Sequence, residues 1–427
     1  MTQHILKIIW NERKTNAWIV LEYVLVFCIL WFCCDYLYYI GKSYYEPMGF
    51  DINNTYSIQM GEKNSAGNSY AETGKMTQDE KYSYTLTLIE RLKKYPGIEY
   101  VCFSLASRPY SSGSSTMRLS INSDTIQQSF RMRKVSSEFF DVFRIKLTKG
   151  KQFNWADPTI ENQILISSDR NGNFGDKKIS SYPATGVNKL GQKKNDNNPF
   201  VVIGNTEKLK STFIEPYTNT VFIPINEREY NMTFSEITIR INSNAAKGFE
   251  ERFIKDMKEQ LNIVPYEFVK ISSLKEMQKT DMDRKGITNN LKSMYVITTF
   301  LIINIFLGVI GTFWYRTESR RSEIGLRVAL GSTKRKIKTF LYMETIILLF
   351  ISAFIGVNIC INLGQTDLLT TLGIPKANAE QLGSGIEQYF INFALTFLFL
   401  AFISILAVWY PARQSSNMQP AEVLHEE

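Results

Sequence analysis

The residues that most often carry chemistry are scarce in this 427-residue chain and poorly placed for it. The two histidines, His4 and His425, lie at its two ends, and of five cysteines only Cys102 falls outside the long apolar runs. A catalytic triad or a zinc site needs several convergent His or Cys side chains, and a disulfide needs a second cysteine. The sequence therefore predicts no catalytic, cofactor-binding or metal site, and no disulfide in the long polar segment.

Nucleotide hydrolysis is also not expected from this chain. A phosphate-binding loop requires a glycine, four further residues and then Gly-Lys-Ser or Gly-Lys-Thr. The sequence contains Gly41-Lys42-Ser43, but Tyr36 occupies the position of the earlier glycine. We predict that the chain is not an enzyme.

Three acidic residues, Glu22, Asp35 and Glu344, interrupt otherwise apolar runs. A charge inside a bilayer is costly, so each indicates a function such as proton coupling. However, each lies near an end of its run, where it can reach water or a basic neighbour such as Lys338. We favour structural pairing and keep the functional alternative open.

Four apolar runs are each long enough to cross a bilayer as a helix, which needs about 20 residues. They predict transmembrane helices at residues 17–40, 293–315, 339–364 and 388–410. The first run has no small-residue cleavage site after it, so we interpret it as an uncleaved signal anchor. Residues 1–16 form a short amphipathic helix on the cytoplasmic face in this scheme.

The net charge of +8 is best explained by membrane orientation. Segment 316–338 is rich in Lys and Arg, whereas loop 365–387 contains only Lys376. Positive loops stay inside, so segment 316–338, both termini and the tail 411–427 are predicted to be cytoplasmic. Residues 41–292 and the short loop 365–387 are then outside. Nucleic-acid binding is not expected, because the basic clusters adjoin membrane spans.

The external segment contains the same pattern near each of its ends. A strand at 54–60, a helix opened by a Thr77–Glu80 capping box and a strand at 98–105 form one β-α-β unit. A strand at 236–241, a helix at 246–261 and a strand at 264–270 form the other. The fold class is thus a four-helix membrane bundle with a large α+β external domain, ferredoxin-like at 41–110 and 226–272.

Residues 111–225 are predicted to form a β-rich insertion between these two units. Its expected strands are Met117–Ile121, Gln128–Val135, Gln163–Ile166, Phe200–Ile203 and Thr220–Ile225. Ser136 and Ser137 are expected to cap a short helix in EFFDVF, and residues 61–75 to form a polar loop.

The connection back to the membrane is predicted to be one long helix. Ser273 and Glu276 have capping-box spacing, and no proline follows until after Ile374. A single helix from Ser273 to Trp314 would make residues 273–292 a rigid stalk, and the first span could likewise continue to Tyr45. The alternative is that Gly286 breaks the helix.

The loop after the second span contains a further helix candidate, with Gly331 ending it and Ser332 capping the next helix. Its mixed apolar and basic residues suit docking into a partner's groove, or a simple surface turn. The residues alone leave both open. The candidate site comprises Glu323, Ile324, Gly325, Leu326, Arg327, Val328, Ala329, Leu330 and Gly331.

Three segments resemble the MacB/FtsX/LolC-type ABC transporter permeases, the type VII ABC systems. They are RRSEIGLRVALGSTKRKI in this loop, VSSEFFDVFRIKLTKGKQF in the external domain, and the tail with Pro411-Ala412-Arg413 followed by Pro420, Glu422, Val423 and Leu424. The resemblance implies a MacB-like periplasmic domain whose insertion 111–225 is sabre-like and whose remainder is porter-like.

The resemblance also implies partners. Such permeases pair, so a second copy or a related permease is expected, and cytoplasmic ABC ATPase subunits would bind the loop helix. ATP and Mg would be bound by that ATPase, since MacB carries an ATPase on the same chain and this sequence does not. A periplasmic adaptor, an outer-membrane channel and membrane lipids are further expected partners, and the bacterial inner membrane is the expected location.

The implied function is mechanotransmission, in which ATP hydrolysis drives conformational work in the periplasm. Efflux of peptides, antibiotics or other toxic compounds, or lipoprotein release, are the expected tasks. The alternative is an FtsX-like regulator that activates a periplasmic cell-wall hydrolase without moving cargo. A sensor kinase or independent enzyme is disfavoured, because no cytoplasmic segment is large enough.

Overall fold

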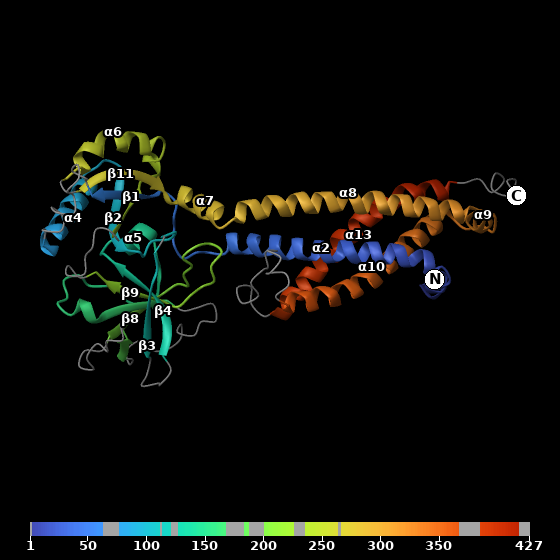
Figure 1. Ribbon diagram of the computed structural model, residues 1–427, viewed down its shortest axis with the longest axis horizontal. Helices are drawn as coiled ribbons and strands as arrows, with labels where there is room; N and C mark the ends of the chain where they lie inside the picture. Colours follow the sequence, from blue (N-terminus) through green and yellow to red (C-terminus); the bar gives the residue numbers. More distant parts are fainter. Residues whose placement is uncertain are drawn as a thin grey trace. The chain divides into compact units, whose positions relative to one another are not determined.

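The computed structural model describes residues 2–62, 77–111, 113–120, 127–167, 183–187, 200–225, 235–263, 266–366 and 385–417 (Figure 1). The chain divides into a helical unit, Met1–Lys42 with Gly286–Glu427, and a sheet unit, Ser43–Lys285. Most of the predicted loops at 61–75 and 365–387, and the tail residues Pro420 to Leu424, lie outside the described residues.

The helical unit contains four long helices that are each apolar enough to cross a membrane, which confirms the prediction of four transmembrane helices. They are α2 (Arg13–Tyr45), α8 (Ile287–Ser319), α10 (Lys334–Gln365) and α13 (Gly385–Ser416). Two short helices accompany them, α1 (Thr2–Asn11) and α9 (Arg321–Ala329). The long helices extend beyond the predicted apolar runs, and α2 continues to Tyr45 as expected, because a helix need not end where its apolar residues end.

Small residues allow these helices to pack closely. The Phe27 ring of α2 lies against Gly356 of α10, where an added methyl group would overlap it. The same ring lies 6.2 Å from that of Phe393 in α13, measured between centroids. Tyr23 donates a 2.9 Å hydrogen bond to the Ser404 hydroxyl of α13. Helix α2 is thereby fixed to both α10 and α13.

The sheet unit contains the two expected β-α-β units. The first is β1 (Thr55–Glu62), α4 (Gln78–Lys93) and β2 (Ile98–Leu105), and the second is β10 (Ser235–Ile241), α6 (Phe249–Leu261) and β11 (Tyr266–Ser273). Their strands lie antiparallel in the order β11-β1-β10-β2, the interleaved order of a ferredoxin-like fold. Thr77 and Glu80 form the predicted capping box.

Both faces of this sheet are covered, which the alternation along β10 does not reveal. Ile237, Ile239 and Ile241 face the core that contains α4 and α6. Thr238 and Arg240 point the other way, yet they are also buried, because the short helix α5 (Phe139–Phe143) packs on that face (Figure 1).

The insertion extends the same sheet through the pairing of β2 with β4, so the strands continue as β2-β4-β3-β7-β8-β6-β9. It also contains strand β5, which pairs with β8. Its strands are β3 (Ser115–Ser120), β4 (Gln127–Val135), β5 (Leu147–Gly150), β6 (Gln163–Ser167), β7 (Pro183–Val187), β8 (Phe200–Thr206) and β9 (Thr220–Pro224). Single 3₁₀ turns occur at Ile160–Asn162 and Ser243–Ala245. Strands β5 and β7 were not predicted, since both are short and rich in polar or small residues.

Two predicted helix caps were wrong. Glu138 precedes α5 without a side-chain cap, while the Ser136 hydroxyl accepts a 3.0 Å hydrogen bond from the Phe103 amide of β2. Helix α10 is capped by Thr333 and not by Ser332, since the Thr333 hydroxyl accepts from the Lys336 amide. In the first case the Ser136 hydroxyl bonds to β2 instead of capping α5. In the second case Gly331 ends the preceding turn, and the new helix is capped two residues later, at Thr333.

The prediction of one helix from Ser273 to Trp314 was also wrong, and the proposed stalk at 273–292 is divided. Helix α7 (Leu274–Arg284), which Ser273 caps as predicted, ends at Lys285, and α8 starts at Ile287. Gly286 between them has a φ of +71°, in the left-handed region that favours glycine. Arg284 and Lys285 both pair with Asp281, which fixes the last turn of α7.

Candidate functional site

Helix α9 lies outside the four candidate spans, between the end of α8 and the start of α10. Ile324 and Gly325 are buried, whereas Leu326 and Leu330 have 53% and 79% of their surface exposed. Residues four apart share one side of a helix, so these two leucines form an outward apolar face. Lipid can cover exposed leucines within a span, but α9 is beyond the spans and its face is available to a protein.

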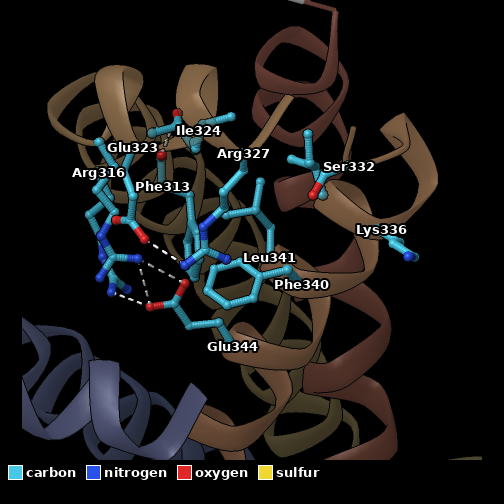
Figure 2. Close-up of a pocket in the computed structure, with 13 residues that line it drawn as sticks. Phe313, Arg316, Glu323, Ile324, Arg327, Ser332, Lys336, Phe340, Leu341 and Glu344 are labelled. Carbon is cyan, nitrogen blue, oxygen red and sulfur yellow. Dashed lines mark hydrogen bonds and ion pairs between the residues drawn. The ribbon is translucent and has the colours of Figure 1, made fainter. Parts of the chain in front are cut away.

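One arginine fixes α9 against α10. Arg327 pairs with Glu323 one turn earlier in α9, with 2.5 Å between the guanidinium nitrogen and the carboxylate oxygen. Its guanidinium carbon lies 4.8 Å from the centroid of the Phe340 ring in α10 (Figure 2). Such a cation–π contact ties the orientation of α9 to that of the following helix.

Beneath α9 lies a cluster of buried charges. Glu344 of α10, which is 1% exposed, accepts from Arg316 of α8 at 2.5 Å and from Arg320 at 3.2 Å. Glu12, in the link between α1 and α2, pairs with both arginines. Figure 2 shows Arg316 and Glu344 facing each other across the site. The cluster therefore links α8 and α10 to the connection between α1 and α2 through charge.

The carboxylates compensate these buried cations. Burial alone would lower the pKa of Arg320, but Glu344 and Glu12 outweigh that effect, and its pKa is raised above the ordinary value. Buried ion pairs cost solvation free energy, yet removing one partner leaves an uncompensated charge and is strongly destabilising. The cluster consequently favours a single arrangement of the helices.

A cavity of about 250 Å³ separates α9 from this cluster. Its apolar wall includes Phe313, Ile324 and Phe340, and Arg316 and Glu344 line its charged side (Figure 2). The cavity is lined both by residues of α9, among them Ile324 and Arg327, and by members of the charge cluster.

The predicted site residues do not all come together in one site. Glu323 to Ala329 lie in α9, Leu330 ends that helix, and Gly331 has a φ of +91°. Glu344 lies beneath α9, and its ion-pair partners are Arg316 and Arg320, not Lys338.

The other two acidic residues lie elsewhere in the bundle. Asp35 accepts hydrogen bonds from the side-chain amides of Gln388, at 2.5 Å, and Asn392 in α13. The Glu22 carboxylate occupies the space beside Gly308 of α8. They do not join the charge cluster.

In the sequence alone, Arg316 and Arg320 are only signals of membrane orientation, and nothing singles out Glu12. One signal could have found the two arginines. Two arginines four residues apart at the end of an apolar run share a helix face, and the acidic Glu344 in the next run is a natural partner.

Among the residues that the structure describes, no group of three His, Cys, Asp or Glu side chains is placed to hold a metal ion. Burial raises the pKa of the Cys102 thiol, which keeps this sulfur protonated and unreactive.

Two family models match the chain. A MacB-like periplasmic core domain matches residues 42–253, and an FtsX-like permease C-terminal domain matches residues 295–420, which include the whole of α9 and Glu344. The chain belongs to the MacB/FtsX-type ABC permeases. Together the models cover the sheet unit up to residue 253 and most of the last three spans.

Curated relatives of this permease are similar at a low level. The macrolide export ATP-binding/permease protein MacB of Pasteurella multocida is 23% identical over 300 residues, which cover 69% of this chain and 42% of the relative. The probable syringafactin export ATP-binding/permease protein SyfD of Pseudomonas syringae is 24% identical over 307 residues, which cover 69% of this chain and 42% of that protein. The chain thus spans about two fifths of the length of these relatives.

Two solved structures are similar to part of the permease. The extracellular domain of the ABC-type transporter YknZ from Gram-positive bacteria is 14% identical with a TM-score of 0.31, and the match covers 51% of this chain and 100% of that domain. The periplasmic region of MacB from Actinobacillus actinomycetemcomitans is 15% identical with a TM-score of 0.33, covering 56% and 97%.

Proposed function

We propose that this permease is the membrane subunit of an ABC complex and couples ATP hydrolysis by separate cytoplasmic ATPase subunits to movement of its sheet unit. ATP and Mg are bound by the ATPase. The observation that carries the proposal is the outward apolar face of α9, formed by Leu326 and Leu330 beyond the spans. An apolar helix face is what a groove on a partner recognises.

The contacts around α9 support a mechanical role. A displacement of α9 acts directly on α10, because Arg327 packs on Phe340. The charge cluster then makes α8 and α10 move with α1 and α2, since Glu344 and Glu12 share Arg316 and Arg320. Two connections lead to the sheet unit: the continuous helix α2, and α8 through Gly286 to α7.

The proposed setting is the bacterial inner membrane, with α9 and both termini cytoplasmic and the sheet unit periplasmic. The basic segment 316–338 supports this orientation. A dimer with a second copy or a related permease is part of the proposal, as are contacts with a periplasmic adaptor and an outer-membrane channel.

Export is the favoured task, because the names of the relatives describe export of a macrolide and of syringafactin. Peptides, antibiotics or other toxic compounds are the proposed cargo, with lipoprotein release as a related task. The alternative proposal is an FtsX-like regulator that activates a cell-wall hydrolase without moving cargo, and the family match does not distinguish it from export. A hydrolase bound to the sheet unit would favour regulation, and an adaptor bound there would favour export.

The docking proposal can be tested with Leu326→Asp, which places a charge on the apolar face without disturbing a buried side chain. The tagged chain is purified from its native host in mild detergent, and co-purifying proteins are identified by mass spectrometry. We expect an ABC ATPase with the wild type and at least tenfold less of it with the variant.

The matched control is Ile254→Asp, which introduces the same charge at an apolar residue of α6 that is 39% exposed. It should retain the ATPase at the wild-type level. Undiminished ATPase with Leu326→Asp would refute the assignment of α9 as the docking helix.

A further inference from the structure

A second cavity, of about 190 Å³, lies in the sheet unit, and all of its lining residues fall between Ala106 and Lys285. This volume is many times the roughly 10–15 Å³ that one water molecule needs. Five cations line it: Arg108, Arg131, Arg133, Arg284 and Lys285. The coupling mechanism proposed above assigns no ligand to this basic pocket, although Arg284 and Lys285 at the end of α7 line it.

Arg133 of β4 is the unusual member of the basic pocket, because its side chain is only 2% exposed and lacks a carboxylate partner among the described residues. Its guanidinium donates to the Ser107 carbonyl and, at 2.6 Å, to the Ser211 hydroxyl, and it lies 4.8 Å from the Phe50 ring centroid. Its Nε atom is buried without a hydrogen-bond partner in the described structure.

Other buried cations of the sheet unit are paired. Arg240 contacts Asp51 at 3.3 Å and donates to three backbone carbonyls. Lys210 pairs with Glu46. Because a buried cation without an anion is costly, the exception at Arg133 requires an explanation.

The rest of the basic pocket does not supply the missing charge. Glu215 pairs with Arg131 at 2.9 Å and lies 3.9 Å from Lys285, while Asp281 pairs with Arg284 and Lys285. Arg108 pairs with Glu236 at 3.3 Å. Three carboxylates therefore serve five cations, and two positive charges remain in excess. Burial and the neighbouring Arg131 lower the pKa of Arg133, whereas Glu236 and Glu215 oppose that effect.

We propose that this basic pocket binds a phosphate group, either inorganic phosphate or a phosphate monoester. A phosphate monoester carries about −1.5 to −2 charges at pH 7, which matches the excess of two, whereas a single carboxylate matches half of it. A planar guanidinium group can donate two parallel hydrogen bonds to two phosphate oxygens. Arg131 lies at the rim of the pocket, with a quarter of its side chain exposed.

The test uses the full chain in detergent and titrates inorganic phosphate against it by calorimetry, with chloride holding ionic strength constant. Arg133→Met removes the buried charge, and Arg131→Gln removes a rim charge with less risk to folding. Both should weaken phosphate binding at least tenfold. Arg118→Gln, an equal charge change at an exposed residue of the neighbouring strand β3, should change the affinity less than twofold.

A second arm distinguishes a lipid source from a soluble one. The chain is placed in phosphatidylcholine nanodiscs with or without phosphatidic acid, whose headgroup is a phosphate monoester. Two outcomes would identify a lipid phosphate as the ligand. In one, phosphatidic acid competes with inorganic phosphate; in the other, phosphatidic acid without inorganic phosphate protects the wild type against thermal unfolding and does not protect the Arg131→Gln variant. Absence of binding in both arms, or wild-type affinity in Arg131→Gln, would overturn the proposal. Neither result bears on ATPase docking by α9.

Discussion

The charge cluster beneath α9 and the basic pocket of the sheet unit both contain buried arginines. They differ in whether carboxylates of the same chain compensate the arginine charges. Arg316 and Arg320 share two carboxylates, Glu344 and Glu12, so their charges are compensated within the chain. Arg133 has a carbonyl, a hydroxyl and an aromatic ring instead. A compensated cluster fixes an arrangement of helices, whereas an uncompensated one leaves a site for an anion.

The largest effect is expected from Glu344→Gln. This change leaves Arg316 and Arg320 buried with less compensation, and it should lower the free energy of unfolding by about 3–5 kcal/mol. Thermal or denaturant unfolding of the full chain in detergent measures the loss. In Glu318→Gln, the same change in the exposed pair with Arg321, the loss should be below about 1 kcal/mol. Equal stability of the two variants would contradict the compensated cluster.

An intermediate effect is expected from Ser211→Ala in the basic pocket. It removes the hydroxyl that accepts from Arg133 and leaves a buried donor unsatisfied, at a cost of about 1–3 kcal/mol. The same unfolding measurement in phosphate-free buffer reports it. Thr116→Ala, which removes an exposed hydroxyl from β3, serves as the control and should be near neutral. If Ser211→Ala is also neutral, Arg133 does not depend on this contact.

The smallest effect is expected at Gly286, the residue between α7 of the sheet unit and α8 of the helical unit. Gly286→Ala meets open space but must keep a φ of +71°, so it should destabilise the chain by about 1 kcal/mol. Gly311→Ala within α8 also meets open space and has an ordinary helical φ, so it should not destabilise. Stabilisation by Gly286→Ala in the same unfolding assay would mean that a continuous helix is readily accessible, as the sequence first indicated.

Local patterns predicted much of the fold because they depend on neighbouring residues. The apolar runs specify spans by length, the Thr77–Glu80 spacing specifies a helix start, and the alternation along 236–241 specifies a strand. Gly286 shows the limit of this approach. A glycine costs a helix only about 1 kcal/mol, and the ion pairs of Asp281 with Arg284 and Lys285 fix the turn that precedes the break.

The sequence by itself determined a four-span membrane protein with two β-α-β units and a helix at 323–330, and a family resemblance supplied the docking role expected of that helix. Only the tertiary structure decided the partners of the buried charges: Glu344 meets Arg316 and Arg320, while Arg133 meets no carboxylate in the described chain. The physical reason is that hydrophobic periodicity and the length of an apolar run can be read within one continuous segment of the sequence. Charge compensation depends instead on side chains that folding brings together from distant segments.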